Sequence, residues 1–316
     1  MDFPQDIKRA IEEEANNYSI STLKTLSKKI SKNYLERTKD GENFINDERE
    51  VLVYALTRMP ATFGAISFAL EKGLELIDDN INSVIDLGSG TGSGILAAKS
   101  LISNKIPMFC VEKEVEMINF SKKYVSNDLV NYHQSEIKNL VVKDTYDLVM
   151  ASYVLNELSD IEKQDALSKI ISLTNKYILI VEPGTPENYK QMLIYRDYLL
   201  GEGFNIVAPC PHNGKCPITE NDWCHFLTRV QRSKLHKLLK DGDAPYEDEK
   251  FTFLFMSKLP LVKKVDDRIL RHPIVHKGNI SIITCNKDCS IKQYLFTKKD
   301  KVKYKASKKL SAGDLL

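Results

Sequence analysis

Long apolar segments are missing from this sequence. No stretch approaches the roughly 18 consecutive apolar residues that a membrane-spanning helix needs. The opening residues, Met1 to Asp6, show neither the apolar run of a secretory signal nor the arginine-rich composition of a transit peptide. We therefore expect a soluble, cytoplasmic bacterial protein that does not enter a membrane, and we expect a monomer.

An overall charge imbalance is also missing, but the charges are unevenly distributed. Lysine and arginine total 45 against 43 aspartate and glutamate, yet residues 257–309 hold 15 basic and 4 acidic side chains. The rest of the chain is therefore acidic. Such a basic segment favours a polyanion partner, with nucleic acid the usual one, although a solvated lysine-rich tail would look the same.

The order of apolar patterns predicts three regions. Residues 1–80 show helical spacing and form an N-terminal helical region. Residues 81–258 alternate short apolar strands with helices, which predicts a doubly wound parallel sheet of the α/β class. A cysteine-rich insertion lies at about 208–240. Residues 259–316 form a basic, β-rich C-terminal extension with strands at 279–284 and 291–296.

A glycine-rich loop follows the first predicted strand and opens a helix. Its sequence is Asp86-Leu87-Gly88-Ser89-Gly90-Thr91-Gly92. Glycines let the backbone approach a ligand, and the helix start adds free N–H groups. This spelling resembles class I S-adenosylmethionine (SAM) methyltransferases of Rossmann-like fold. The predicted SAM contacts here are Asp86, Gly88, Ser89, Gly90 and Gly92. An altered or empty pocket is the alternative.

Acidic residues at the following strand ends complete the predicted SAM site. Glu112 ends the second strand, and its two oxygens suit the vicinal hydroxyls of a ribose. Ser135 and Glu136 follow the third strand, where such folds contact adenine.

A methyl-transfer motif is missing after the fourth strand. Residues 152–158 contain neither an Asn/Asp-Pro-Pro-aromatic turn nor a nucleophilic cysteine. Asn156 and Glu157 could orient a substrate, but helix capping is the simpler interpretation. Because methyl transfer from a sulfonium depends mainly on alignment, the catalytic residues stay unknown and enzymatic activity stays open.

Paired C-x-x-C motifs are missing as well, although the chain has six cysteines. Cys210, Cys216 and Cys224 are separated by five and seven residues and surrounded by prolines. Clustered cysteines in a reducing compartment favour a metal over disulfides. The fourth ligand could be Cys285, Cys289, His212 or His225, and four thiolates suit either a [4Fe–4S] cluster or zinc.

Basic side chains follow the cysteines on a predicted helix from Phe226 to Leu239. We predict that they contact nucleic-acid phosphates, whereas a solvated helix face is the alternative. The residues are Arg229, Arg232, Lys234 and Lys237.

These motifs together resemble the methyltransferase-like proteins of the mitochondrial small ribosomal subunit and their bacterial relatives. The resemblance covers roughly residues 45–314 and rests on three segments: 58–63, 208–217 and 222–226. It implies a small-subunit assembly or translation factor that binds rRNA, has a SAM pocket of doubtful catalytic use, and holds an iron–sulfur cluster through four cysteines. By position these are Cys210, Cys216, Cys224 and Cys285, with Cys289 as a competitor for the fourth place.

Two further functions remain open from the sequence. The chain could be an active SAM-dependent methyltransferase that modifies rRNA or a ribosomal protein. A small-molecule methyltransferase is a weaker alternative, because the basic region at 257–309 has no role in it.

Overall fold

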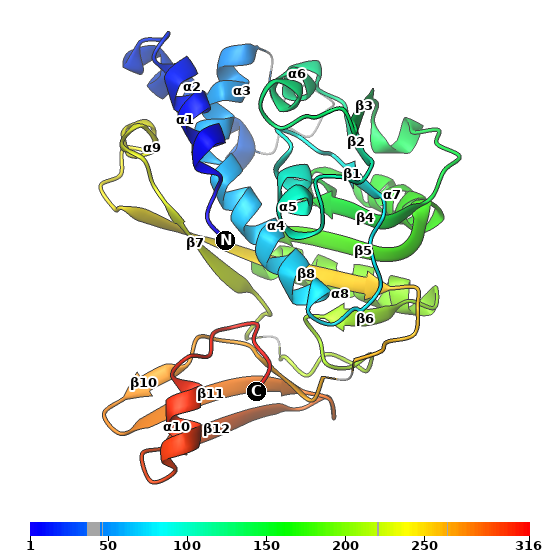
Figure 1. Cartoon of the computed structure of the whole chain (residues 1–316), viewed down its shortest axis with the longest axis vertical. Coiled ribbons are helices and arrows are strands. Elements are labelled where there is room, and N and C mark those ends of the chain that lie inside the picture. The colour runs from blue at the N-terminus through cyan, green and yellow to red at the C-terminus, as the bar shows by residue number, and fades with distance from the viewer. Residues whose placement is uncertain (37–44, 46, 220, 264) are drawn as a thin grey trace. The chain divides into compact units, whose positions relative to one another are not determined.

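The computed structural model describes residues 1–36, 45, 47–219, 221–263 and 265–316, with side chains omitted at 34–36. The chain divides into two compact units. Figure 1 labels its helices and strands. Unit 1 comprises residues 1–68, 81–175 and 228–249. Unit 2 comprises residues 69–80, 176–227 and 250–316. Unit 1 contains the predicted SAM site and the predicted nucleic-acid residues, and unit 2 contains the four predicted cysteine ligands.

Helices fill the first part of unit 1, as predicted. They are α1 (Gln5–Ala15), α2 (Ile20–Glu36), α3 (Glu48–Thr57) and α4 (Met59–Leu74), the last of which continues into unit 2. Asp47 caps α3 by accepting hydrogen bonds from the backbone N–H groups of Arg49 and Glu50. This arrangement satisfies donors that have no partner within the helix.

Four parallel strands form the sheet of unit 1. In spatial order they are β3 (Val130–Gln134), β2 (Met108–Glu112), β1 (Val84–Leu87) and β4 (Tyr146–Ser152). The intervening helices are α5 (Ser93–Leu101), α6 (Val115–Tyr124) and α7 (Asp160–Leu173), with 3-10 turns η1 (Ile137–Asn139) and η2 (Leu155–Glu157). Every residue of β1 is buried, as expected of a central parallel strand. The chain thus has the predicted α/β methyltransferase fold.

The predicted helix from Phe226 to Leu239 is wrong. The segment forms strand β7 (Phe226–Gln231) followed by the short helix α9 (Lys234–Leu239). Strand β7 pairs with the start of β8 (Tyr246–Ser257). Helix α9 begins after Ser233, because the Ser233 hydroxyl oxygen accepts a hydrogen bond from the backbone N–H of His236 at 3.1 Å.

Unit 2 contains the antiparallel strands β5 (Thr174–Pro183), β8 and β6 (Asn205–Ala208), with β8 between the other two. Helix α8 (Pro186–Gly201) connects β5 to β6. Strands β6 and β8 therefore form an antiparallel pair, with a register shift between Ile206 and Ala208. Phe251, Phe253 and Phe255 of β8 are fully buried, so this strand forms the core of the unit.

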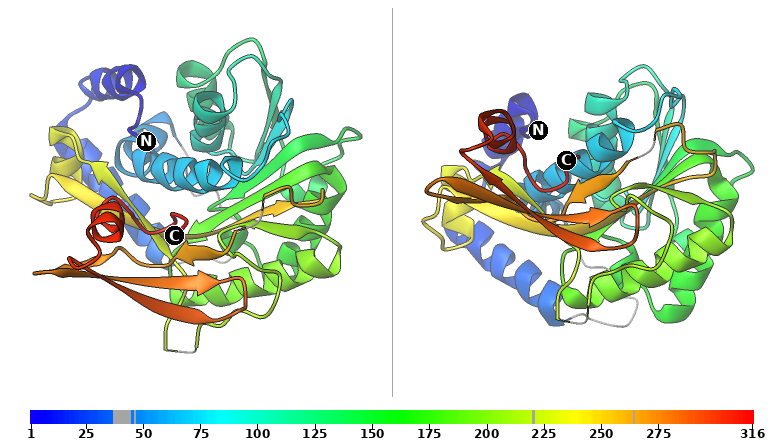
Figure 2. Two further views of the ribbon diagram at one scale, coloured as in Figure 1. Left: turned by 60° about the horizontal axis from the view of Figure 1, so that its bottom comes forward. Right: turned by 90° about the horizontal axis from the view of Figure 1, so that it is seen from below.

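A separate antiparallel sheet occupies residues 267–297. Its strands are β9 (Asp267–Ile269), β10 (Ile274–His276), β11 (Asn279–Asn286) and β12 (Ile291–Thr297). Helix α10 (Lys301–Ser307), which the sequence did not predict, lies over one face (Figure 2). Its Tyr304 joins Ile269, Ile280 and Ile282 in a small core.

Among the described residues, no single helix meets the length and hydropathy expected of a membrane span. The pair α3 and α4 meets them only jointly, across a bend of 54°.

Candidate functional site

The glycine loop of unit 1 has two kinds of glycine. Gly88 and Gly92 have φ angles of 71° and 90°, and a Cβ at either would clash with a side chain, 2.4 Å from Val154 and Ser121 respectively. Gly90 also has a positive φ, of 50°, but nothing lies within 4 Å of its missing Cβ. Gly88 and Gly92 are therefore needed for the turn, whereas Gly90 presents bare backbone to open space.

Glu112 closes the glycine loop from the end of β2. One carboxylate oxygen accepts the N–H of Gly90 at 2.8 Å, and the other accepts those of Lys113 and Glu114 at 2.8 and 3.0 Å. A carboxylate offers about four acceptor positions, so capacity for one further donor remains. The predicted acidic partner is thus placed against the loop and stabilises it before any ligand binds.

Asp86 lies under the loop and is almost completely buried. A Cβ on Gly94 would approach its carboxyl oxygen to 2.3 Å, so the first turn of α5 packs directly on this group. Burial, reinforced by the negative charge of Glu112, raises the pKa of Asp86 to about 8. At neutral pH the buried carboxyl is therefore mostly protonated.

The other predicted SAM residues have different positions. Ser89 is buried in the loop, and its hydroxyl has no hydrogen-bond partner among the described residues. The Ser135 backbone N–H donates to the Glu112 carbonyl at 3.0 Å, which fixes the end of β3 beside β2. Glu136 is exposed and accepts a hydrogen bond from Asn139 at 3.1 Å.

A tyrosine that the sequence did not single out follows β4. Tyr153 is buried, has a φ of 57°, and donates a hydrogen bond to Glu249 at 3.1 Å. Arg58 binds the same carboxylate at 3.3 and 3.4 Å. A left-handed conformation at a bulky residue is strained and is concentrated at functional sites. The contacts among Arg58, Glu249 and Tyr153 hold this conformation directly after β4, in the segment that lacks a methyl-transfer motif.

The predicted cysteine ligands line one cavity in unit 2. Its volume is about 30 Å³, and its lining includes Cys210, Cys216, Cys224 and Cys285. A single water needs about 10–15 Å³, so the cavity can hold more than one water. Segments up to 75 residues apart in the sequence therefore converge, although no three His, Cys, Asp or Glu side chains in the described residues form a metal-binding group.

Two arginines that the sequence did not identify flank these cysteines. Arg268 is 1% exposed and donates to the carbonyl oxygens of Pro209 at 3.1 Å and Gly313 at 2.7 Å. Arg196, 3% exposed, donates to Asp197 and to the Gly214 carbonyl. The Arg268 Nη2 and Arg196 Nε atoms have no hydrogen-bond partner among the described residues. Buried guanidinium groups with unsatisfied donors favour an anion nearby.

Neighbouring side chains also contact the sulfur atoms. The Tyr189 hydroxyl lies 3.2 Å from the Cys216 sulfur, and the His212 Nε2 lies 3.4 Å from that of Cys285. Burial raises the pKa of Cys210 to about 11 and that of Cys285 to about 12. Without a bound cation these thiols therefore stay protonated, because burial disfavours the thiolate.

Cys285 and Cys289 occupy different positions. Cys285 lies opposite Arg268 in the β9–β11 ladder, so both side chains are on one face of the sheet. Cys289 is in the β11–β12 turn, with its sulfur 2.5 Å from the position a Cβ would take on Gly214. It does not line the cavity. Of the two cysteines among the candidates for the fourth ligand, only Cys285 therefore lines the cavity with the other three.

Acidic neighbours already bind two of the four predicted nucleic-acid residues. Arg229 forms a two-bond pair with Asp248 at 2.7 and 2.9 Å. Arg232 binds Glu247 at 2.8 Å, as Lys240 does at 2.7 Å. Lys234 is exposed and Lys237 is half-exposed on α9, and neither has an ion pair among the described residues. The arginine charge of this stripe is thus compensated within unit 1, whereas the charge of its two lysines is not.

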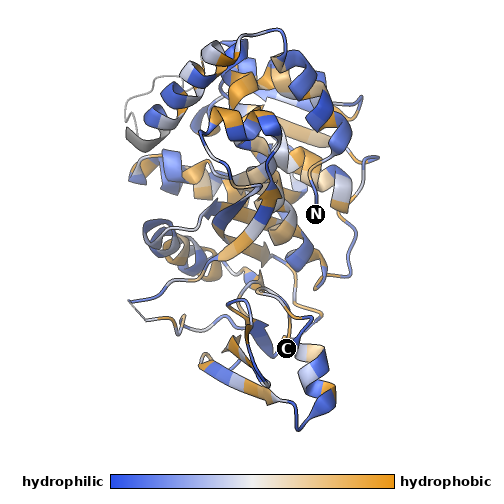
Figure 3. Cartoon of the chain, turned by 90° about the vertical axis from the view of Figure 1, so that its left-hand side faces the viewer, coloured by the Kyte–Doolittle hydropathy of each residue, from blue (hydrophilic) through white to orange (hydrophobic). Residues whose placement is uncertain are grey.

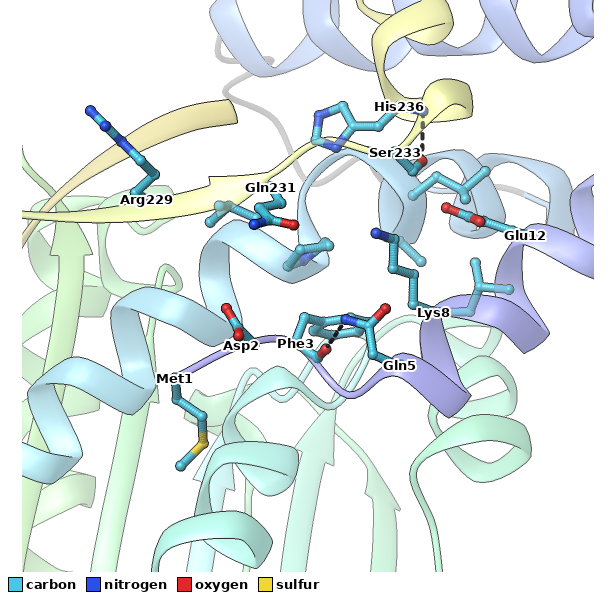
Figure 4. A pocket seen from close by; sticks show the side chains of 15 residues that line it. Met1, Asp2, Phe3, Gln5, Lys8, Glu12, Arg229, Gln231, Ser233 and His236 are labelled. Carbon is cyan, nitrogen blue, oxygen red and sulfur yellow. Dashed lines mark hydrogen bonds between the residues drawn. The ribbon is translucent and has the colours of Figure 1, made fainter. Parts of the chain in front are cut away.

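A larger cavity of about 80 Å³ lies elsewhere in unit 1. It is lined by residues near the start of α1 and by β7 and α9, including Phe3, Lys8, Gln231 and His236 (Figure 4). None of the predicted SAM or cysteine residues lines it.

The chain matches the family model described as mitochondrial small ribosomal subunit Rsm22 over residues 48–316. This protein belongs to the Rsm22 family. The match extends over both units, including the glycine loop and the cysteine cavity, and confirms the family resemblance found in the sequence.

Curated relatives are distant and longer. The mitochondrial Rsm22-cox11 tandem protein 2 of Schizosaccharomyces pombe is 25% identical and matches 88% of this chain and 44% of its own. The mitochondrial ribosome assembly protein METTL17 of Homo sapiens is 24% identical and matches 66% and 48%. The chain thus spans less than half of these relatives. Because they are mitochondrial proteins, the prediction of a bacterial cytoplasmic location is contradicted.

Solved methyltransferase structures are also similar to this chain. The putative RNA methyltransferase PH1948 of Pyrococcus horikoshii has a TM-score of 0.45 at 13% identity, covering 74% of this chain and 98% of its own. A putative SAM-dependent methyltransferase of Methanococcus maripaludis, mmp1179, has a TM-score of 0.44 at 14% identity, covering 54% and 92%.

Proposed function

We propose that this Rsm22-family protein is an rRNA-binding assembly factor of the small ribosomal subunit. In this proposal a metal cluster stabilises unit 2 and SAM binds at the glycine loop of unit 1. Membership of the family supports the ribosomal role. The observation that supports the metal cluster is the cavity lined by Cys210, Cys216, Cys224 and Cys285, together with the buried Arg196 in its lining.

The donor set of the cavity fits an anionic metal centre. Four thiolates around iron–sulfur or zinc leave a net negative charge, which would compensate the guanidinium groups of Arg196 and Arg268. A bound metal would also deprotonate thiols whose pKa burial has raised. We assign the centre as [4Fe–4S], with zinc as the alternative, held by Cys210, Cys216, Cys224 and Cys285.

Metal analysis of anaerobically purified protein tests this assignment. We expect iron and sulfide in equal amounts and a broad visible absorption that dithionite bleaches. Cys285→Ser should lose the iron, whereas Cys289→Ser serves as the matched control and should retain it. A colourless protein that contains only zinc would reject the iron–sulfur assignment, and iron loss in Cys289→Ser alone would move the fourth ligand to residue 289.

SAM fits the loop in unit 1. The open space at Gly90, the bare N–H groups at the start of α5 and the remaining acceptor capacity of Glu112 suit an amino acid and a ribose. Calorimetric titration with SAM measures this. Glu112→Gln should lose SAM binding and also unfold at a lower temperature, because its amide replaces one of the two accepting oxygens with a donor. Equal SAM binding by the variant would reject the site.

A second candidate function is methyl transfer to rRNA or a ribosomal protein. The strained Tyr153, held by Glu249 and Arg58 after β4, is the observation that favours it. Transfer of label from SAM to small subunits isolated from a deletion strain discriminates between the two roles. Rescue of subunit assembly by a variant that cannot bind SAM, without incorporation of label, would leave only the binding role.

A further inference from the structure

Lysine side chains gather at one end of the small antiparallel sheet in unit 2. The β10–β11 turn carries Lys277, and the β12–α10 connection carries Lys298 and Lys299. The Lys298 backbone N–H donates to the Gly278 carbonyl at 3.1 Å, so turn and connection lie side by side. We call Lys277, Lys298, Lys299 and Lys301 the lysine end; all four are exposed.

The charge of the lysine end is not compensated by the small sheet and α10. The one acidic residue in the connection, Asp300, caps α10 by accepting the backbone N–H of Lys303 at 3.1 Å. Its other oxygen lies 3.9 Å from the ammonium of the same lysine. Within the described residues no ion pair is recorded for Lys277, Lys298, Lys299 or Lys301.

The opposite end of the same sheet provides a contrast. There Lys287 pairs with Asp266 at 2.5 Å, and Lys292 pairs with Asp288 at 2.7 Å. Colouring by hydropathy shows α10 largely hydrophilic (Figure 3). Strand β11 runs from Asn279 at the lysine end to Cys285 beside the cavity, six residues or about 20 Å away.

We propose that the lysine end binds backbone phosphates of RNA, an assignment that rests on the proposed ribosomal function. Uncompensated exposed ammonium groups bind phosphates and release counterions, which is the main source of sequence-independent affinity for nucleic acid. In the β7–α9 stripe, Asp248 and Glu247 already bind the two arginines, which leaves only Lys234 and Lys237. The lysine end has four exposed ammonium groups, so we place the principal RNA contact at residues 277 and 298–301.

Salt-dependent RNA binding by the metal-loaded full chain tests the lysine end. The probe is a fluorescent RNA hairpin of about 20 nucleotides, measured by anisotropy between about 50 and 200 mM KCl. K298Q/K299Q should bind several-fold more weakly and reduce the salt slope by about 1.4–1.8, because each lost phosphate contact contributes about 0.7–0.9.

K287Q/K292Q is the matched control, with two lysines removed from the same sheet at its other end. It should bind like wild type, and metal content with thermal unfolding must be unchanged in both variants. Equal effects of the two variants, or no effect of either, would overturn the proposal. Tighter binding to phosphatidylserine vesicles than to RNA, abolished by K298Q/K299Q, would reassign the surface to membranes.

Small-subunit assembly in a deletion strain separates this proposal from the proposed function. If wild type restores assembly and K298Q/K299Q matches it in both rescue and RNA binding, only the lysine end is rejected. Failure of wild type itself to restore assembly would reject the ribosomal role, whatever the RNA binding shows.

Discussion

The glycine loop of unit 1 and the cysteine cavity of unit 2 differ in how the chain satisfies their polar groups. At the loop, Glu112 accepts three backbone N–H groups, so the loop is stabilised without a ligand. At the cavity, nitrogen atoms of Arg196 and Arg268 are buried without a partner among the described residues. Hydrogen bonds to Glu112 thus hold the loop of unit 1, where only the Ser89 hydroxyl is buried without a partner among the described residues, whereas the proposed metal centre would complete the interior of unit 2.

The largest expected effect is the removal of one cavity thiol. Cys224→Ser should lose the metal and unfold unit 2 at a much lower temperature, since structural metal binding can contribute on the order of 10 kcal/mol to folding. SAM affinity, measured by calorimetric titration, should change less than about twofold if the two sites are independent. Cys110→Ala is the reciprocal control, because Cys110 is buried in β2 of unit 1.

Arg268→Met tests whether the cavity holds negative charge. With an anionic centre present, removing the buried cation should destabilise unit 2 by about 3–5 kcal/mol. With no centre present, the variant loses only the bonds to the Pro209 and Gly313 carbonyls, and we expect a smaller cost of about 1–3 kcal/mol. Denaturant unfolding of metal-loaded and chelator-treated protein measures both cases, and a stabilised loaded variant would contradict the anionic centre.

The pH dependence of unit 1 should reflect Asp86. Its folded pKa of about 8 lies above the usual unfolded value of about 3.9, so the folded protein retains a proton that the unfolded chain releases. The contribution of Asp86 to the free energy of unfolding is therefore fully present below about pH 4. It is lost as the pH rises through about 8. Asp86→Asn should therefore gain stability relative to wild type progressively between about pH 4 and pH 8, by up to a few kcal/mol. A constant difference across the titration would argue against this proton.

Two alanine substitutions separate the roles of the loop glycines. Gly94→Ala places a Cβ against the Asp86 carboxyl and should cost about 1–3 kcal/mol of stability. Gly90→Ala has open space and should cost about 1 kcal/mol for its positive φ, yet reduce SAM affinity more strongly. Thermal unfolding and calorimetric titration with SAM compare the two variants. If Gly90→Ala and Gly94→Ala bind SAM equally well, Gly90 is not part of the SAM site.

The smallest effect concerns the Tyr189 hydroxyl beside the Cys216 sulfur. A hydrogen bond to a ligand sulfur stabilises the more negative, reduced cluster. Tyr189→Phe should therefore lower the reduction potential of the proposed cluster by roughly 20–60 mV. This shift corresponds to the free energy of one ordinary hydrogen bond, about 0.5–1.5 kcal/mol, for a one-electron couple. A redox titration followed by visible absorption measures it, and an unchanged potential with intact iron content would exclude this contact.

The fold and the glycine loop could be predicted because their signals are local. A buried apolar strand, a run of glycines and a following helix occupy only the segment from Val84 to Ala98. Glu112 was found in the same way, as a carboxylate at a strand end. Helix α10 also had a local signal that was missed, namely the capping residue Asp300.

The remaining features depend on contacts between distant segments. Arg229 pairs with Asp248 because strands β7 and β8 form a hairpin. Composition alone does not show this pairing, so the sequence predicts that Arg229 is free to bind phosphate. Arg268 shows no sequence signal, because its burial follows from β9 pairing with β11 opposite Cys285. Ser233 caps helix α9 directly after strand β7. The apolar spacing on either side of it nevertheless resembles that of one continuous helix.

Arg268 has a consequence for the lifetime of the polypeptide. Its guanidinium donates hydrogen bonds to the carbonyl oxygens of Pro209 and Gly313. Its backbone lies opposite Cys285 in the β9–β11 ladder. These bonds tie residues 313–315 to the wall of the cavity. If the tie is broken, as in Arg268→Met, this segment loses its anchor and becomes more accessible to peptidases.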